Sequence, residues 1–199
     1  MPPNPLPAAA YLIAIIAFAM TSASAAPDAD DTGITVDLRR SGDAIEVDVD
    51  MRIEATPDEV WAVLTDYDHM ASFVSNVIAS RVVRHAGDTL EVEQASRLAF
   101  GPLELTFENV REATLKRPVE IRTRLLRGDM KDSTFTTRLT AESPGTHVAN
   151  HGRFIADRWI PPVIGTSVLA AETRKQFAEF RAEILRRKRE APRRRKRSR

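Results

Sequence analysis

The chain has 199 residues, a formal net charge of +1 and no cysteine. This length suits one domain with a substantial core, and the lack of cysteine excludes disulfides, thiol catalysis and thiolate metal sites. The small net charge hides an asymmetry, because residues 186–199 hold 10 Lys/Arg and one Glu, which leaves 19 Lys/Arg against 27 Asp/Glu elsewhere.

The first 25 residues predict a secretory signal peptide. Ala8 to Met20 form an apolar run of 13 residues, shorter than the roughly 20 residues that a membrane-spanning helix needs. Residues 23–25 (Ala-Ser-Ala) then provide the small-x-small pattern after which signal peptidase cuts. We therefore expect cleavage after Ala25, a mature chain of 174 residues (199 minus 25), and secretion across the inner membrane to the periplasm.

Two elements are predicted directly after this segment. Residues 34–53 alternate apolar and charged side chains on both sides of 41–43 (Ser-Gly-Asp), which predicts a β-hairpin with one buried face. Residues 56–59 (Thr-Pro-Asp-Glu) have the pattern of a capping box with proline in the first turn, so a helix should begin there. It should break near Asp66 and resume briefly toward Phe73, because Asp and His have low helix propensity.

Asp66, Asp68 and His69 lie within four positions of each other at this break. Such a cluster could bind a hard cation or hold a histidine for proton transfer. Short polar side chains at a helix end more often bond to nearby backbone groups. We therefore interpret the cluster as part of the architecture, with Tyr67 and Met70 packing inward beside it.

A meander and a long helix follow. Period-two alternation returns between residues 77 and 155 in runs separated by turn residues, which predicts antiparallel strands. Beyond Pro161 and Pro162, apolar residues recur at spacings of three, four and six from Ile164 to Leu185, which predicts a helix with one apolar side. The element order predicts an α+β fold in which a strongly curved antiparallel β-sheet wraps around the long C-terminal helix.

Three segments, residues 55–83, 124–148 and 158–184, resemble the START-like (SRPBCC) superfamily of helix-grip proteins over about residues 44–187. The closest resemblance is to the polyketide cyclase/dehydrase and coenzyme Q-binding branch. It implies two short helices after the first strands, and an elongated cavity between sheet and terminal helix for lipids, isoprenoid quinones, sterols or aromatic polyketides. The START-like ligand-binding domain would span residues 26–187, followed by a disordered basic tail at 188–199.

The apolar faces of the predicted strands contain small neutral polar residues among large apolar ones. A closed core would avoid so many polar groups, because each buried unpaired one costs on the order of 1 to 3 kcal/mol. A ligand-filled cavity would use a few of them for orientation; alternatively, they lie near strand ends and reach water. The candidate ligand-binding residues are Trp61, Tyr67, Val92, Gln94, Ser96, Leu105, Phe107, Asn109, Ile121, Thr123, Phe135, Thr137, Asn150, Phe154 and Phe177.

The predicted inward faces, which also include Val119, contain no Arg, Asp, Glu or His. This composition disfavours acid–base catalysis, and we find neither a catalytic motif nor metal-ligand spacing; His147 and His151, four apart on a strand, are not adjacent. We expect no catalytic residue, no metal and no cofactor, and a protein that binds or transports a lipid or isoprenoid quinone. A cyclase- or dehydratase-type enzyme acting on an aromatic or polyketide substrate, and a partner-binding module without ligand, remain alternatives.

The basic tail is a separate feature. On an exported protein it would meet an anionic membrane or envelope surface, and a polybasic segment gains roughly 1 kcal/mol per Lys/Arg near such a surface. Nucleic acid would be a partner only if the chain were not exported. The alternative is a tail that only improves solubility.

Overall fold

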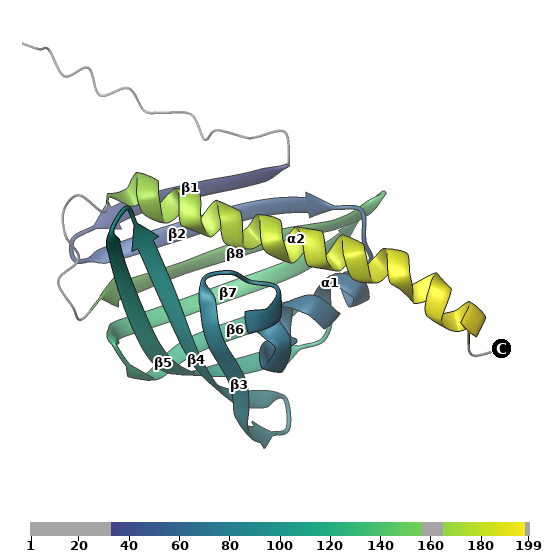
Figure 1. Cartoon of the computed structure of the whole chain (residues 1–199), viewed down its shortest axis with the longest axis horizontal. Coiled ribbons are helices and arrows are strands. Elements are labelled where there is room, and N and C mark those ends of the chain that lie inside the picture. Colours follow the sequence, from purple (N-terminus) through teal and green to yellow (C-terminus); the bar gives the residue numbers. More distant parts are fainter. Residues whose placement is uncertain (1–32, 157–164, 198–199) are drawn as a thin grey trace, which may run out of the picture.

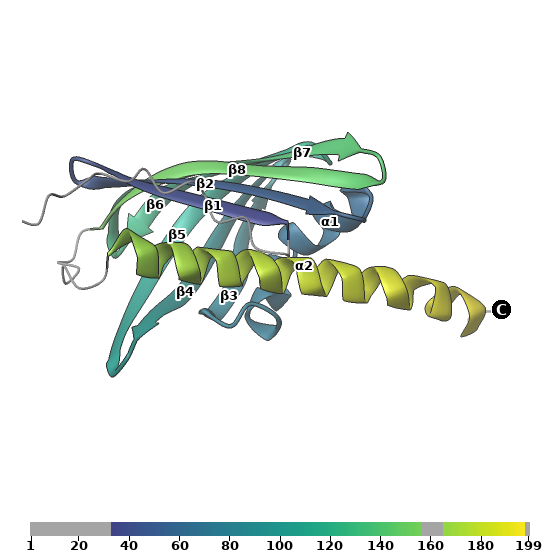
Figure 2. The ribbon, with the colours of Figure 1, turned by 90° about the horizontal axis from the view of Figure 1, so that it is seen from above.

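The computed structural model describes residues 33–156 and 165–197. The predicted signal peptide, Pro161, Pro162 and Ile164 lie outside the described residues. The described parts form one strongly curved antiparallel sheet with a long helix across its concave face (Figure 1; Figure 2). The predicted α+β helix-grip fold is thereby confirmed.

The sheet has eight strands in the order β1-β2-β8-β7-β6-β5-β4-β3. The meander from β3 to β8 pairs sequential strands, and β8 then closes against β2 of the first hairpin. The strands are β1 (Ile34–Ser41), β2 (Ala44–Ile53), β3 (Val77–Ala86), β4 (Thr89–Phe100), β5 (Leu103–Lys116), β6 (Glu120–Gly128), β7 (Met130–Glu142) and β8 (Gly145–Ala156).

The connection between β2 and β3 contains both predicted short helices, α1 (Pro57–Leu64) and the 3-10 helix η1 (Tyr67–Ser72). The capping box forms as predicted: the Glu59 N–H donates to Thr56 Oγ1 (3.3 Å), and the Thr56 N–H donates to Glu59 Oε2 (2.8 Å). These two bonds satisfy backbone donors that a helix start leaves unpaired. The cap therefore fixes where the chain leaves β2 and turns under the sheet.

Polar contacts to distant elements hold the break between α1 and η1. Asp66 occupies the N-cap position of η1, but its side chain makes no capping hydrogen bond; it lies 2.7 Å from His69 Nδ1 and 2.8 Å from Arg187 Nη2. Burial raises the pKa of Asp66, but the bonds from His69 and Arg187 outweigh this effect, so the pKa lies below its usual value. Asp68 accepts a hydrogen bond from the Val82 N–H (2.7 Å). The cluster is architectural, although it ties η1 to β3 and to the long helix instead of capping local backbone.

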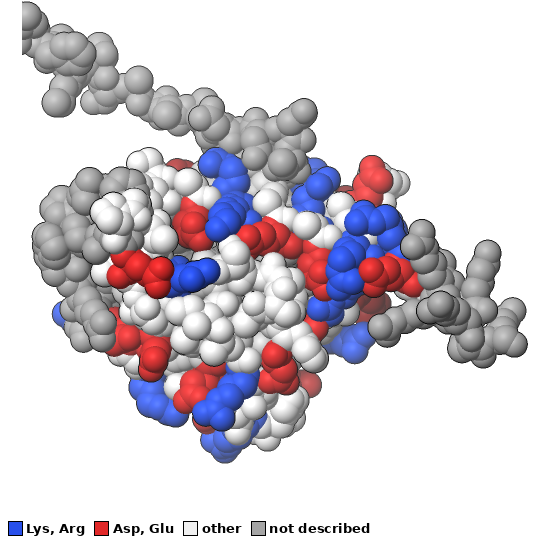
Figure 3. Space-filling model, in the orientation of Figure 1, with Lys and Arg blue, Asp and Glu red and all other residues white. Residues whose placement is uncertain are grey.

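The long helix α2 (Thr166–Arg197) packs against β1 and α1. Phe177, Phe180 and Ile184 are buried on its inner side. In its C-terminal half Glu183 forms ion pairs with Arg186 and Arg187. Figure 3 shows acidic and basic residues side by side on this face of the molecule. The backbone of α2 is helical to Arg197, which differs from the disordered tail expected from residue 188, because Arg, Lys, Glu and Ala are good helix formers. No helix in the described ranges is long and apolar enough to cross a membrane.

The main core lies between the sheet and the two helices and contains buried residues from all eight strands. It includes Met51, Val60, Val63, Val148 and Ile184, whose side chains are essentially inaccessible to water. Val119 was predicted to face inward, which is wrong. It is 51% exposed because it lies just before strand β6, which begins at Glu120.

Candidate functional site

An interior cavity of about 180 Å³ lies between α2 and the concave face of the sheet. Its walls come from β2, α1, η1, β4 to β8 and one side of α2. The walls are mostly apolar, with neutral polar groups and a single charged residue. The lining residues are Val47, Leu64, Tyr67, Met70, Gln94, Arg111, Ile121, Thr123, Phe135, Thr137, Asn150, Thr173, Gln176, Phe177 and Phe180.

Strand alternation explains which side chains reach this cavity. On β5, Asn109, Arg111, Ala113 and Leu115 share one face because successive side chains of a strand point to opposite sides. That face is turned toward α2, since Ala113 is fully buried and Leu115 packs on the core. The prediction that the inward faces carry no ionisable group is therefore wrong: Arg111 lines the cavity. The inward positions assigned to this strand ended at Asn109, although the same alternation continues to Arg111.

Phe135 reaches the cavity because the neighbouring strand leaves room for its ring. Gly152 on β8 pairs directly with Phe135 on β7. A Cβ atom at Gly152 would lie 2.1 Å from the Phe135 ring, which is closer than any van der Waals contact permits. The glycine therefore lets the ring lie flat against the β8 backbone and sets one wall of the cavity.

Arg111 is half-buried and has no carboxylate neighbour in the cavity, because the described lining residues include no Asp or Glu. Burial lowers the pKa of its guanidinium, and the nearby Tyr67 partly opposes that effect. Burial likewise raises the pKa of the Tyr67 hydroxyl to about 12, against the influence of Arg111. At neutral pH the site thus combines a cationic donor and a neutral hydroxyl donor.

Two side-chain amides complete the polar part of the cavity. The buried Asn150 Oδ1 has no hydrogen-bond partner among the described residues. The buried Gln94 Nε2 has only weak partners, the Met70 sulfur at 3.3 Å, a poor acceptor, and Ser80 Oγ at 3.5 Å. A buried polar group without a good partner carries a free-energy cost that a ligand or water would remove. The cavity therefore offers unused hydrogen-bonding capacity beside apolar walls.

Eight of the sequence-predicted site residues line this one cavity: Tyr67, Gln94, Ile121, Thr123, Phe135, Thr137, Asn150 and Phe177. Sequence reasoning missed Arg111 and the α2 residues Thr173 and Gln176. The two helix residues point into the cavity because of the way α2 crosses the sheet. Phe180, predicted to pack on the sheet, also lines the cavity.

The other predicted site residues lie elsewhere. Trp61 and Val92 are buried in the main core, where other side chains cover them. Phe107 forms a second apolar cluster with Leu98, and Leu105 packs against it under the first turn of α2. Asn109 Oδ1 accepts a hydrogen bond from the Met130 N–H (3.2 Å), Ser96 is half-buried on β4, and Phe154 packs at the edge of the core. These seven residues face inward or pack, but they do not line the cavity.

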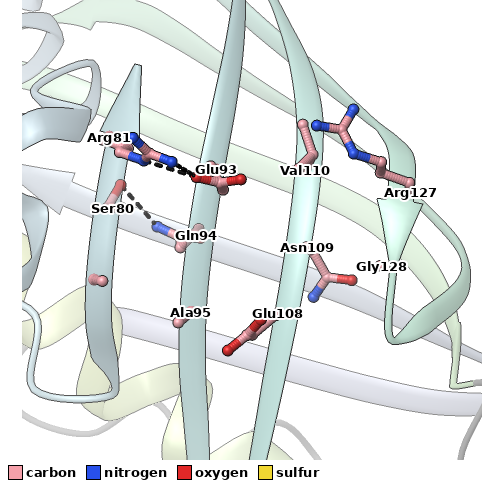
Figure 4. Close-up of a pocket in the computed structure, with 11 residues that line it drawn as sticks. Ser80, Arg81, Glu93, Gln94, Ala95, Glu108, Asn109, Val110, Arg127 and Gly128 are labelled. Carbon is pink, nitrogen blue, oxygen red and sulfur yellow. Dashed lines mark hydrogen bonds and ion pairs between the residues drawn. The ribbon is translucent and has the colours of Figure 1, made fainter. Parts of the chain in front are cut away.

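A second, larger hollow of about 460 Å³ crosses β3, β4 and β5 near the end of β6 (Figure 4). Its rim includes the ion pair between Arg81 and Glu93, and Ser80 beside Gln94. Most of its lining residues point away from α2, because they alternate along the strands with residues that face the helix. They are Ala79, Arg81, Glu93, Ala95, Glu108 and Val110. We call this hollow the surface groove; its paired charges make it the poorer candidate for an apolar ligand.

Metal and cofactor sites were also sought in the described part of the chain. It contains no group of three or more His, Asp or Glu residues able to hold a metal ion. His147 and His151 instead pair with Asp50 (2.7 Å) and Asp48 (2.6 Å) on the neighbouring strand β2.

Comparison with known proteins gives one family and several similar folds. The sequence profile of the family described as polyketide cyclase/dehydrase and lipid transport matches residues 44–189. A STAR-related lipid transfer protein from Xanthomonas axonopodis is similar in structure, with a TM-score of 0.68, 15% identity, and coverage of 80% of this chain and 98% of that one. The Zhui aromatase/cyclase from a Streptomyces species gives a TM-score of 0.58, 16% identity, and coverage of 76% and 96%.

A protein from Thermus thermophilus gives a TM-score of 0.61, 18% identity, and coverage of 70% of this chain and 97% of that one. No curated protein sequence matches the chain. The solved structures share the fold at low identity, and they include both a lipid transfer protein and a cyclase.

Proposed function

Because the chain belongs to the polyketide cyclase/dehydrase and lipid transport family, we propose that it binds and carries a hydrophobic small molecule without transforming it. Family and fold together support a domain for hydrophobic ligands. The observation that carries the proposal is the interior cavity, in which apolar walls surround hydrogen-bonding groups that lack protein partners. Ligand sites in proteins commonly combine these two features.

The size of the cavity bears on which ligand is bound. Sites for drug-sized ligands usually measure about 300–1,000 Å³, whereas this cavity measures about 180 Å³. A single- or double-ring head group fits this space. A lipid or isoprenoid quinone would need further room, and its chain would have to displace the adjacent apolar cluster of Leu98 and Phe107 under the first turn of α2.

A cyclase- or dehydratase-type enzyme is the second candidate, and one observation favours it. Tyr67 and Arg111 reach the same cavity and could polarise a carbonyl oxygen of an aromatic or polyketide substrate. Catalysis of this kind also needs a group that accepts a proton near neutral pH. Among the described lining residues only Tyr67 could do so, and with a pKa of about 12 it is protonated at neutral pH. We therefore rank the carrier first.

We also propose that the chain is exported to the periplasm and that its basic C-terminus attracts it to an anionic membrane or envelope surface. The apolar run of residues 8–20 and the pattern at 23–25 support export. The cluster of 10 Lys/Arg in residues 186–199 supports the surface attraction. A mature N-terminus at residue 26, measured by mass spectrometry of the expressed protein, is the expected result for export.

Native mass spectrometry of the purified protein tests the carrier proposal. We expect an adduct of a hydrophobic molecule that organic extraction removes, and rebinding after the extract is returned. Replacing Thr137 by Phe should fill the cavity and abolish the adduct. The control, Thr136→Phe, alters the neighbouring residue on the opposite face of β7 and should retain it. An adduct equally present in both variants would contradict binding in this cavity.

A further inference from the structure

We propose that Arg111, together with Tyr67 and Asn150, binds the carboxylate of an anionic hydrophobic ligand inside the interior cavity. This inference rests on the proposed function and adds the chemical class of the ligand. The three residues come from β5, η1 and β8, so the fold brings them together from distant parts of the sequence.

The first argument is the missing counter-charge. Arg111 lines the cavity, while no described lining residue is Asp or Glu and no described residue forms an ion pair with Arg111. By contrast, Arg124 on β6, whose side chain points to the opposite face of the sheet, pairs with Glu112 at 2.8 Å. Removing a cation from water is costly unless a negative partner compensates it. Inside this cavity the ligand is the remaining source of that charge.

The second argument is the set of donors around the guanidinium. The Tyr67 hydroxyl stays protonated at neutral pH, so it can donate a hydrogen bond. Asn150 has an unpartnered side-chain oxygen, and a half-turn of its amide would present the NH₂ group instead. A carboxylate has about four acceptor positions and is acceptor-only when ionised. Arg111 and the nearby Tyr67 can therefore both donate to it, and Asn150 lines the same cavity from β8.

The third argument is charge balance, which favours a carboxylate over a phosphate monoester. A phosphate monoester carries about −1.5 to −2 charge at neutral pH, and the described cavity wall supplies one cation. The excess negative charge would stay uncompensated in an apolar space. A planar carboxylate also matches the two parallel N–H donors of a guanidinium. The expected ligand is thus a hydrophobic monoanion with a compact ring or branched body.

The test is isothermal titration calorimetry of the extracted full-length protein with three probes that share a ring system: naphthoate, naphthamide and naphthyl phosphate. We expect naphthoate to bind at least about ten-fold more tightly than naphthamide, because hydrogen bonds to charged partners are the stronger ones. Naphthyl phosphate should bind more weakly than naphthoate. Tighter binding of the phosphate would overturn the carboxylate assignment.

The variant Arg111→Met should lose about ten-fold or more in naphthoate affinity and change naphthamide affinity little, because it removes the charge and the paired N–H donors while keeping an unbranched side chain. The matched control is Arg127→Met, which removes the same charge from an exposed position at the surface groove and should leave both affinities unchanged. Tyr67→Phe should reduce naphthoate affinity by a smaller factor. A carboxylate preference that survives Arg111→Met would overturn the proposal.

Thermal melting followed by circular dichroism shows whether each variant is still folded. Arg111→Met should melt at or above the wild-type temperature, since it removes a half-buried charge that has no ion-pair partner among the described residues. Arg111→Lys is the second variant; it keeps the charge but not the paired donors, so its naphthoate affinity should fall between those of Arg111→Met and the wild type. Equal binding of naphthoate and naphthamide by the wild type would overturn the proposed carboxylate site but not the proposed carrier function. Binding of no probe, with no co-purified adduct, would overturn the proposed function as well.

Discussion

The two halves of the concave face of the sheet differ in what they bury. Under β1, β2 and β8, the side chains of Met51, Val49 and Val148 pack with α1 and the middle of α2 at 0–2% exposure. Across β4 to β7, the same face carries Gln94, Arg111, Thr123 and Thr137 around a cavity that also reaches Val47 of β2 and Asn150 of β8. One sheet therefore combines a dry core, which stabilises the fold, with a polar-lined space that weakens packing and provides room for a ligand.

The largest expected effect on the free energy of unfolding is in the well-packed core around Met51. Met51→Ala on β2 should lower the free energy of unfolding by about 2–5 kcal/mol, the usual range for a large-to-small substitution in a core. Thr137→Ala on β7 should change it by less than about 1 kcal/mol, because the half-buried Thr137 borders a space already unfilled. Chemical denaturation of both variants gives the comparison. An equal loss of unfolding free energy in the two variants would mean that the core around Met51 and the cavity wall around Thr137 are packed alike.

A glycine substitution should sharpen the comparison by closing the cavity from the side of the sheet. Gly152→Ala places a Cβ atom 2.1 Å from the Phe135 ring and 2.6 Å from the Thr134 carbonyl oxygen, so the ring must move toward the cavity and the paired strands must also shift. We expect a destabilisation of about 1–3 kcal/mol, typical of overpacking, and weaker ligand binding. The control, Ala149→Gly on the same strand, should cost about 1 kcal/mol or less through backbone entropy and leave binding unchanged. Unchanged binding in Gly152→Ala would show that Phe135 does not limit the cavity.

Acid should lower stability through the C-terminal half of α2, which does not line the cavity. Hydrogen bonds from Arg186, with smaller effects from Arg187, lower the pKa of Glu183 to about 2, although burial opposes the change. A carboxyl group with a depressed folded-state pKa stabilises the fold above its unfolded pKa of about 4.3 and loses that contribution as pH falls toward the folded value. We expect stability to decrease between about pH 4.5 and 2, and Glu183→Gln to flatten this dependence. An identical pH profile for the variant would exclude the Glu183 pairs as the cause.

The smallest expected effect on stability belongs to the basic C-terminus. Deleting residues 192–199 removes six positive charges, and should weaken binding to anionic vesicles while leaving the melting temperature nearly unchanged, because the buried residues Phe177, Phe180 and Ile184 of α2 are retained. The attraction should also fade as salt rises, since the Debye length falls from about 30 Å at 0.01 M to about 8 Å at 0.15 M. Equal vesicle binding by both proteins at low salt would leave only a solubilising role.

The strand and helix positions could be predicted because they depend on local patterns. Period-two alternation identified the first hairpin and the meander, the Thr56 capping box fixed the start of α1, and Asp66 marked the break before η1. Arg111 was also within reach, since it continues the alternation of β5 past Asn109. It was missed because the inward face of this strand was followed only as far as Asn109.

The boundaries of the cavity could not be predicted in the same way. Val92 and Thr123 both lie on inward faces, but only Thr123 lines the cavity, while Val92 is covered by the core. Whether an inward residue packs or borders a space depends on sheet curvature and on the crossing of α2, which are properties of the assembled fold. The same holds for Thr173 and Gln176, whose positions on α2 give no local sign that they face the ligand space.

Chemical-shift mapping by NMR tests the difference between the two halves most directly. Titration of the ¹⁵N-labelled protein with naphthoate should shift the amide signals of Arg111, Thr123, Thr137, Asn150 and Gln176, and leave those of β1 and the Met51 region of β2 nearly unchanged. This pattern would place the ligand in the interior cavity under α2. Shifts confined to the surface groove around Ala79 and Glu108, or to the charged end of α2, would contradict the account.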